Sequence, residues 1–114
     1  MAGKSSDIII NVLLDDKQVP EKITWTASDR AEKEPQEVKA LLMALFDKEH
    51  METLKIDLWT KEMQVVEMDR FFFNTLKSMA DTYMRATGNN KLAGAMQQFA
   101  AYFGKETEIL KEES

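Results

Sequence analysis

The chain has 114 residues, a formal net charge of −5 and a hydrophobic content of 44%, values that suit one soluble domain with its own core. The acidic balance, with no run of basic residues, excludes unaided binding to nucleic acid, which requires a basic patch. The sequence has no cysteine, and this excludes disulfides, thiol nucleophiles and cysteine-based zinc sites.

Residues 1–6 are polar from the start and lack the apolar segment of a signal peptide, so a flexible tail is expected there. There is no lipobox cysteine and no apolar run long enough to span a bilayer, so a cytoplasmic protein without membrane insertion is expected. Residues 7–111 are expected to form a single domain, followed by a flexible end at residues 112–114.

Two strands are predicted near the N-terminus. Residues 7–15, DIIINVLLD, are short and rich in β-branched side chains, which is typical of a strand. Residues 22–27, KITWTA, alternate between polar and apolar side chains. The polar turn between these two runs predicts an antiparallel hairpin.

A helix and a third strand are predicted next. Pro35 occupies a position that suits the start of a helix. The apolar residues after it recur at helical spacing, which predicts a helix over residues 35–47: Val38, Leu41, Leu42, Leu45 and Phe46. Residues 53–61, TLKIDLWTK, alternate again and predict the third strand, with Leu54, Ile56 and Leu58 on one face.

The strongest helical pattern in the chain covers residues 65–87. One face of this long helix carries a stripe of apolar residues at spacings of three and four: Val65, Met68, Phe72, Leu76, Met79 and Tyr83. Gly88 suits a left-handed cap after the last turn, and the asparagines that follow can cap another helix. That last helix is expected to continue to near Lys111.

The predicted order β-β-α-β-α-α indicates an α+β fold in which helices pack on a three-stranded sheet. The segment from the second strand through the first helix to the third strand resembles a crossover unit. We therefore expect the strand order 2-1-3, with the first strand in the centre.

The sequence has no candidate catalytic residue with acid, base or metal-ligand partners at the spacing of a known motif. The single histidine, His50, lies in a polar connection and is expected to be a solvated surface residue. The carboxylates of Asp15, Asp16, Glu32 and Glu34 do not follow the spacing of an EF-hand, so a solvated turn is favoured over a calcium site. We expect no enzyme activity, no bound metal and no cofactor.

A few apolar residues do not fit the predicted core. Trp59, Ile9 and Leu13 lie on the sheet face opposite the stripe of the third strand, and Phe71 lies beside the main stripe of the long helix. Either a helix or the N-terminal arm covers this face, or the face is exposed and contacts a partner. In the second case the predicted contact surface comprises Ile9, Leu13, Thr24, Lys55, Trp59 and Phe71.

Three blocks resemble the GldC-type gliding-motility proteins of Bacteroidetes: VPEKITW at residues 19–25, TLKIDLWTKEM at 53–63 and FFFNTLKSMADTYMRAT at 71–87. The acidic-hydrophobic start DIIINVLLDD and the spacing between blocks agree with this resemblance. It implies a small accessory protein of the bacterial gliding machinery and brings no catalytic motif.

Three functional hypotheses follow. The favoured one is a non-enzymatic adaptor that acts through protein–protein contacts, with a homodimer through the outer sheet face or its edge strand as one option. The alternative is a small-molecule carrier or sensor with an apolar pocket between Trp25, Phe46, Phe72 and Phe99. A chaperone-like binder of unfolded segments is the third.

Overall fold

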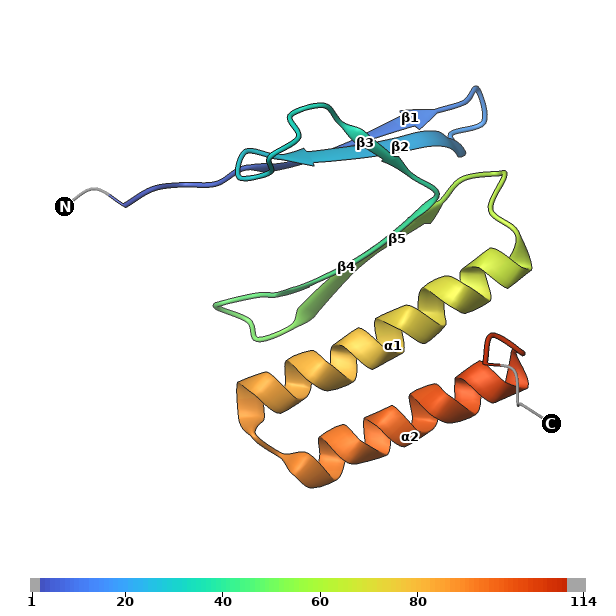
Figure 1. The fold of residues 1–114 in the computed structure, drawn as a ribbon. Coiled ribbons are helices and arrows are strands. Elements are labelled where there is room, and N and C mark those ends of the chain that lie inside the picture. Colours follow the sequence, from blue (N-terminus) through green and yellow to red (C-terminus); the bar gives the residue numbers. More distant parts are fainter. Residues whose placement is uncertain (1–2, 111–114) are drawn as a thin grey trace. The chain divides into compact units, whose positions relative to one another are not determined.

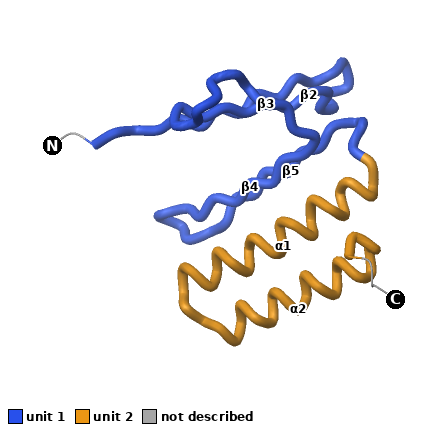
Figure 2. Tube along the Cα trace, in the orientation of Figure 1, with its two compact units in different colours: residues 1–63 blue, residues 64–114 orange. Residues whose placement is uncertain are grey.

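The computed structural model describes residues 3–110 and divides the chain into two compact units, residues 1–63 and residues 64–114 (Figure 2). Unit 1 contains all the strands and unit 2 contains both helices (Figure 1). The expected C-terminal end at residues 112–114 lies outside the described residues, whereas residues 3–6 are described and have no regular secondary structure.

The first two strands form the predicted hairpin. β1 spans Ile8–Leu14 and β2 spans Pro20–Ala27, and they pair antiparallel, with Ile10 opposite Trp25. The Asp15 carboxylate holds the turn, because its Oδ1 accepts hydrogen bonds from the backbone N–H groups of Lys17 (2.8 Å) and Val19 (2.9 Å). This part of the sequence-based prediction is confirmed.

The remaining strands complete the first sheet and build a second, smaller one. β3 (Gln36–Val38) pairs with β2, while β4 (Ala40–Phe46) pairs with β5 (Thr53–Trp59), and both pairings are antiparallel. Lys39 separates β3 from β4, and its carbonyl accepts a hydrogen bond from the backbone N–H of Thr60 at 2.9 Å. One extended segment therefore contributes to both sheets, β1-β2-β3 and β4-β5.

The predicted helix over residues 35–47 is wrong, since this segment forms β3 and β4. Its apolar residues fit a helical stripe, but β4 is apolar at nearly every position, ALLMALF, so the spacing also fits a strand. Alanine, leucine and methionine rank among the best helix formers, but helix propensity is a weak determinant, and pairing with β2 and β5 overrides it.

The predicted strand order 2-1-3 is also wrong. The first sheet has the order β1-β2-β3, so β2 is its central strand. The segment predicted as the third strand, now β5, belongs to the other sheet and pairs with β4. No crossover connection is needed within the described residues, because every pairing is antiparallel. The α+β class is confirmed, and residues 3–110 contain five strands and two helices, whereas three of each were predicted.

The long helix is confirmed as α1, which spans Val65–Thr87. A capping box begins it, in which the Glu67 carboxylate accepts a hydrogen bond from the Gln64 backbone N–H at 3.0 Å. At its end, Gly88 has φ +70° and its N–H donates to the Met84 carbonyl at 2.8 Å. The left-handed backbone explains why glycine stands there.

The second helix, α2, spans Asn90–Glu106 and runs back alongside α1 (Figure 1). The Asn89 side chain accepts a hydrogen bond from the Leu92 backbone N–H at 3.0 Å, so the predicted asparagine cap is confirmed. The helix ends before the expected Lys111, which lies outside the described residues.

Small residues dominate the buried positions of this helical hairpin. The buried positions recur at intervals of seven on both helices, and all of them except Phe73 are alanine: Phe73 and Ala80 on α1, Ala93 and Ala100 on α2. Gly104 is buried on the same side of α2, beside the Phe73 ring. Part of the predicted α1 stripe lies outside the buried contact between α1 and α2, since Val65 is 79% exposed and Met79 is 50% exposed.

Candidate functional site: an apolar cleft in unit 1

Unit 1 contains an apolar pocket at the angle between its two sheets. In the first sheet, alternate residues of β1 and β2 project to one side, where Ile23 is fully buried. Leu41 from β4 reaches the same space from the second sheet. The pocket has a volume of about 260 Å³ and is lined by Ile8, Ile10, Ile23, Trp25, Val38, Ala40 and Leu41.

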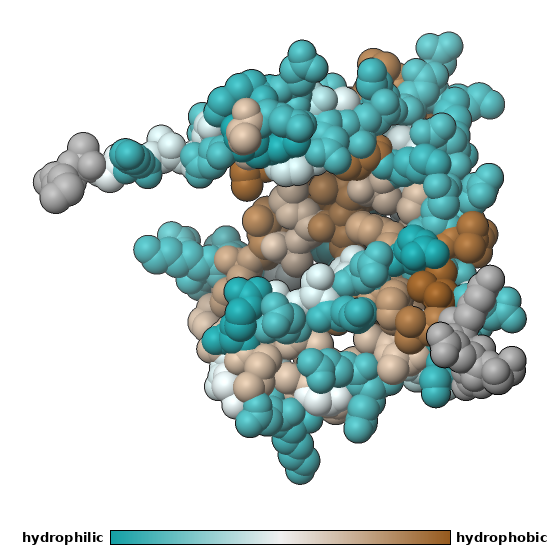
Figure 3. All heavy atoms as spheres, in the orientation of Figure 1, coloured by the Kyte–Doolittle hydropathy of each residue, from teal (hydrophilic) through white to brown (hydrophobic). Residues whose placement is uncertain are grey.

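An exposed apolar surface continues from this pocket along the second sheet. β4 and β5 pair Leu41 with Leu58, Met43 with Ile56 and Leu45 with Leu54, so one face of this sheet carries only apolar side chains. Three of the six are strongly exposed: Leu45 (49%), Leu54 (59%) and Ile56 (45%). We call the pocket and this face together the apolar cleft; Figure 3 shows hydrophobic residues gathered in the hollow between the two sheets of unit 1.

A stacked arginine lies beside the pocket. The Arg30 guanidinium carbon lies 4.4 Å from the centroid of the Trp25 ring, within cation–π range. Its Nη2 donates to Oε1 of Gln36 at 3.0 Å, and it lies 3.8 Å from Glu32. These contacts fix the indole that lines the pocket, so the pocket wall is organised before any ligand binds.

The predicted contact surface does not form one continuous face. Ile9, Leu13 and Thr24 do share the outer face of the first sheet, and Ile9 and Leu13 are 59% and 52% exposed. Lys55 and Trp59 instead lie on β5 in the second sheet, on the side opposite the apolar cleft.

The other predicted contact residues have their own surroundings. Lys55 forms an ion pair with Asp57 at 2.7 Å, and Trp59 is 54% exposed. Phe71 lies on α1 in unit 2, where it lines a groove of about 620 Å³ that runs along α1 and includes Met96 of α2.

Sequence reasoning missed the apolar cleft. It identified the stripe of Leu54, Ile56 and Leu58 correctly but assigned it to a core beneath helices. The available signal was the doubly apolar pattern of residues 40–46, which fits a strand with two covered or binding faces as well as a helix.

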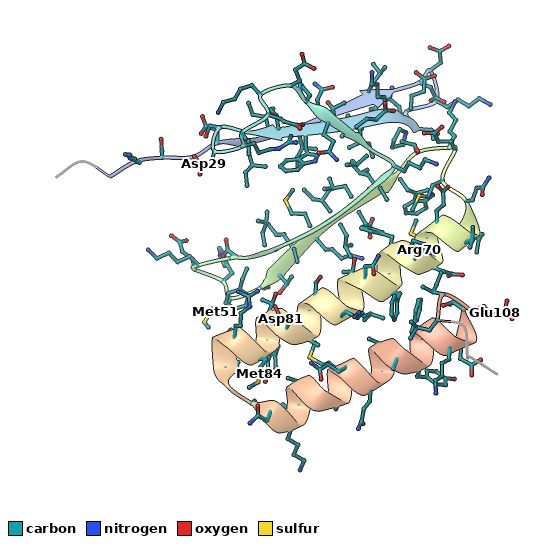
Figure 4. All side chains as sticks on the ribbon, in the orientation of Figure 1. Asp29, Met51, Arg70, Asp81, Met84 and Glu108 are labelled. Carbon is teal, nitrogen blue, oxygen red and sulfur yellow. The ribbon has the colours of Figure 1, made fainter. Side chains whose placement is uncertain are left out.

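His50 is on the turn between β4 and β5, and its side chain is 75% exposed, as expected for a surface histidine. The His50 backbone N–H (2.6 Å) and its imidazole Nδ1 (2.9 Å) both contact Oδ2 of Asp47. The backbone hydrogen bond first, and the imidazole second, lower the pKa of Asp47. Met51 of the same turn has φ +57° and projects outward, 69% exposed (Figure 4). These contacts describe a structured turn.

Asp15, one of the four candidate calcium carboxylates, has a structural role. The Asp15 side chain, 14% exposed, forms an ion pair with Lys61, in addition to holding the β1–β2 turn. Across residues 3–110, no three histidine, cysteine or acidic side chains gather as a metal site would require. Neither of the two described helices is long and apolar enough to cross a membrane.

The Asp15–Lys61 ion pair predicts a specific dependence of stability on pH. The Lys61 ammonium first, and the Val19 backbone N–H next, lower the pKa of Asp15 below its ordinary 3.8, and Asp15 in turn raises the pKa of Lys61 above 10.5. A lowered carboxyl pKa stabilises the fold above the unfolded-state value, and this contribution is lost as pH falls through the folded-state value. A raised lysine pKa stabilises the fold below pH 10.5 and is lost at higher pH.

The substitution Asp15→Asn should therefore reduce stability at pH 7 and narrow the gap in stability between pH 7 and pH 3. Urea unfolding, followed by the fluorescence of Trp25 and Trp59, measures both values. Asp16→Asn removes the same charge from the same turn and serves as the control. An equal pH response in both variants would contradict the role of the ion pair.

Comparison with known proteins gives one match. A family model described as gliding motility-associated protein GldC-like matches residues 20–109. The match covers β2 to β5 and both helices, and it includes most of the residues that form the apolar cleft. Neither the curated proteins nor the solved structures contain a significant match.

Proposed function

The chain belongs to the GldC-like family of gliding motility-associated proteins, and on that basis we propose that it is a non-enzymatic accessory protein of the gliding machinery that acts through protein–protein contacts. Membership in the family associates the chain with gliding motility. The adaptor role is our inference, and the apolar cleft of unit 1 is the observation that carries it.

The chemistry of the cleft supports this role. Its second-sheet face is formed by aliphatic side chains and one methionine, three of which are 45–59% exposed. Exposed apolar surface of this extent usually marks a contact with another macromolecule, because water contact with it is unfavourable. An open apolar face of this kind suits the apolar side of a partner's amphipathic helix, whose side chains would be buried in the cleft.

A complementation experiment in the source bacterium tests this function. Cells that lack the gene are expected to spread less on agar, and the wild-type gene should restore spreading. Leu54→Asp introduces a charge into the cleft at a position that is 59% exposed, so it should spare the fold and abolish complementation. Tyr102→Glu, at an equally exposed site on α2, is the matched control.

Trp59→Asp tests the surface predicted from the sequence in the same assay, because Trp59 lies on the opposite side of the second sheet. Immunoblotting must show equal amounts of each variant. Normal spreading by both Leu54→Asp and Trp59→Asp cells would contradict the contact role of both faces.

A small-molecule carrier is the second candidate, and the pocket beside Trp25 is the observation that favours it. Its volume of about 260 Å³ is at the lower limit of typical ligand sites, so a short acyl chain is the class of ligand that would fit. The four-residue pocket expected from the sequence has no support within either unit, since Trp25 lines a pocket in unit 1 and Phe99 lines a groove in unit 2.

Thermal unfolding with and without octanoate distinguishes the two candidates. A carrier would be stabilised by about 2.7 kcal/mol at a ligand concentration 100 times the dissociation constant. An adaptor would show no shift, and the Trp25→Ala variant would show none in either case. A saturable shift that requires Trp25 would favour the carrier.

A further inference from the structure

β1 forms an edge of the first sheet, and one row of its backbone groups is free to pair. The backbone N–H of Ser28 donates to the Asp7 carbonyl at 3.0 Å and the Asp7 N–H donates to Oγ of Ser28 at 3.0 Å, so the backbone groups of Asp7 are directed at the β2 side. Hydrogen-bonded pairs alternate along antiparallel strands, so Ile9, Asn11 and Leu13 also direct their backbone groups at β2. The intervening residues direct theirs outward, where no described strand pairs with them: Ile8, Ile10, Val12 and Leu14.

This edge lacks charged residues and proline, two features that normally prevent pairing with another chain, and its one register shift lies at its end, between Leu13 and Leu14. The strand IIINVLL contains no charged residue and no proline, and the side chains near its ends are exposed: Ile8 by 71%, Ile9 by 59%, Leu13 by 52% and Leu14 by 42%. β5, in the other sheet, carries the Lys55–Asp57 ion pair. A flat apolar edge without such charges is prone to uncontrolled association unless a defined partner occupies it.

The partner that best fits this edge is a second copy of the same strand. Antiparallel pairing about a two-fold axis at Asn11 places Ile10 opposite Val12, Ile9 opposite Leu13 and Ile8 opposite Leu14. Every aliphatic side chain then meets another on both faces of the sheet. We propose that two copies of this protein pair through β1 in this register and form one continuous six-stranded sheet.

The hydrogen-bonding pattern supports the same register. Ile10 and Val12 both direct their backbone groups outward, so they can form a hydrogen-bonded pair across the axis. Asn11 directs its backbone groups at β2, so the two Asn11 residues form a non-hydrogen-bonded pair with Cα atoms about 4.5 Å apart. Their side-chain amides can then hydrogen-bond to each other. A register shift of one residue would place residues whose backbone N–H and C=O groups point outward opposite residues whose groups point at β2, so they could not pair. A shift of two residues would place Asn11 opposite an aliphatic side chain.

The ends of the strand also agree with this arrangement. In this register Asp7 of one copy is opposite Asp15 of the other, and two bare carboxylates there would repel each other. The Lys61 ammonium is already paired with Asp15, so Asp7 meets a neutral ion pair instead. No charged side chain within β1 calls for a complementary charge on a different protein, which favours self-pairing.

The experiment uses the whole chain and a single introduced cysteine, because the native sequence has none. Asn11→Cys places the two thiols on the axis, where a Cα separation of about 4.5 Å permits a disulfide. Leu13→Cys is the matched control on the same exposed face. Its two copies lie four residues apart along the strand pair, about 13 Å, which is too far to bridge.

Light scattering over a concentration series should show a dimer that dissociates in the micromolar range, because a strand pair buries less than a standard interface. Mild oxidation should cross-link Asn11→Cys at least about tenfold faster than Leu13→Cys, and reduction should reverse it. Asn11→Asp places two negative charges on the axis and should weaken dimerisation at least about tenfold. Circular dichroism should show an unchanged fold, since Asn11 is exposed in the single chain.

Three results would overturn the proposal. The first is light scattering that shows a monomer even at a protein concentration on the order of 0.1 mM, about 100 times a micromolar dissociation constant. The second is equal cross-linking of the two cysteine variants, which would show that the register is wrong. The third is a dimer that Asn11→Asp leaves intact, which would place the interface elsewhere. None of these results would bear on the complementation test with Leu54→Asp, so the two proposals fail independently.

Discussion

Replacing Ile23 with alanine should lower the free energy of unfolding of unit 1 by about 3 kcal/mol. Ile23 is 0% exposed and is the largest side chain among the fully buried residues described. It lies opposite Val12 on β1 and Val38 on β3, in the central strand of the first sheet. Alanine removes three carbons and leaves a cavity beside the pocket, because paired strands on both sides cannot collapse into the space.

The two tryptophans provide the measurement, because Trp25 and Trp59 both belong to unit 1. Urea unfolding monitored by tryptophan fluorescence should show a lower midpoint with an unchanged slope. Ile23→Val, which removes one methyl group, should cost about 1 kcal/mol. Ile9→Ala at a 59% exposed position on β1 is the control and, at protein concentrations below the dissociation range of the proposed β1-paired dimer, should cost less than Ile23→Val. Equal effects of Ile9→Ala and Ile23→Ala would contradict the assignment of Ile23 to the core.

The parts of the fold that the sequence predicted correctly are those that local chemistry determines. The α1 bounds follow from an apolar period that changes at Gln64 and from Gly88, whose left-handed backbone few other residues adopt. The Asn89 cap and the β1–β2 hairpin likewise depend on neighbours only a few residues away. Such features need no knowledge of distant contacts.

The errors arose where distant contacts decide the structure. β4 reads ALLMALF, which is apolar in both the helical and the strand period, so its partner strands determine its conformation. Misassigning this segment as a helix removed the strand that pairs with β5 in the structure and assigned β5 to the first sheet. One ambiguous segment therefore accounts for both the wrong helix and the wrong strand order.

The candidate site was predicted only in part for the same reason. The alternation of β1 and β5 predicts that Ile9, Leu13 and Trp59 lie opposite the stripe of β5, but it leaves open whether they are covered or exposed, and the structure shows them exposed. The apolar cleft was not anticipated, because it depends on β4 bringing Met43 and Leu45 beside Ile56 and Leu54. The sequence of one strand predicts which face of the sheet each of its residues occupies. Predicting a site formed by two strands also requires knowing which strands are neighbours.

In unit 2, exchanging two glycines of the same helix for alanine should change stability in opposite directions. Gly104 is buried, and a Cβ atom at this position would lie 2.7 Å from Cε1 of Phe73 and 2.9 Å from the Leu110 side chain. A Cβ atom at Gly94 would meet nothing within 4 Å apart from its own helix backbone and chain neighbours. Both lie within α2, so the intrinsic preference of helices for alanine over glycine applies to both.

Gly94→Ala should therefore stabilise the helical hairpin by about 0.5–1 kcal/mol. At Gly104 the helix preference for alanine contributes the same stabilisation or less, because this residue is in the last turn of α2. Overpacking against Phe73 destabilises the Gly104→Ala variant by about 1–3 kcal/mol. Phe73 is 6% exposed but lines a pocket of about 280 Å³ together with Leu110, which relieves part of the overpacking, so a net loss of about 1 kcal/mol is expected.

Circular dichroism at 222 nm during urea unfolding follows the helices directly and gives both values. The double variant Phe73→Leu with Gly104→Ala provides a further check. Leucine leaves space where the ring edge met the new methyl group, so adding Gly104→Ala to Phe73→Leu should cost less than adding it to the wild type. If Gly104→Ala stabilises the protein as much as Gly94→Ala does, the close contact between α2 and the Phe73 ring is wrong.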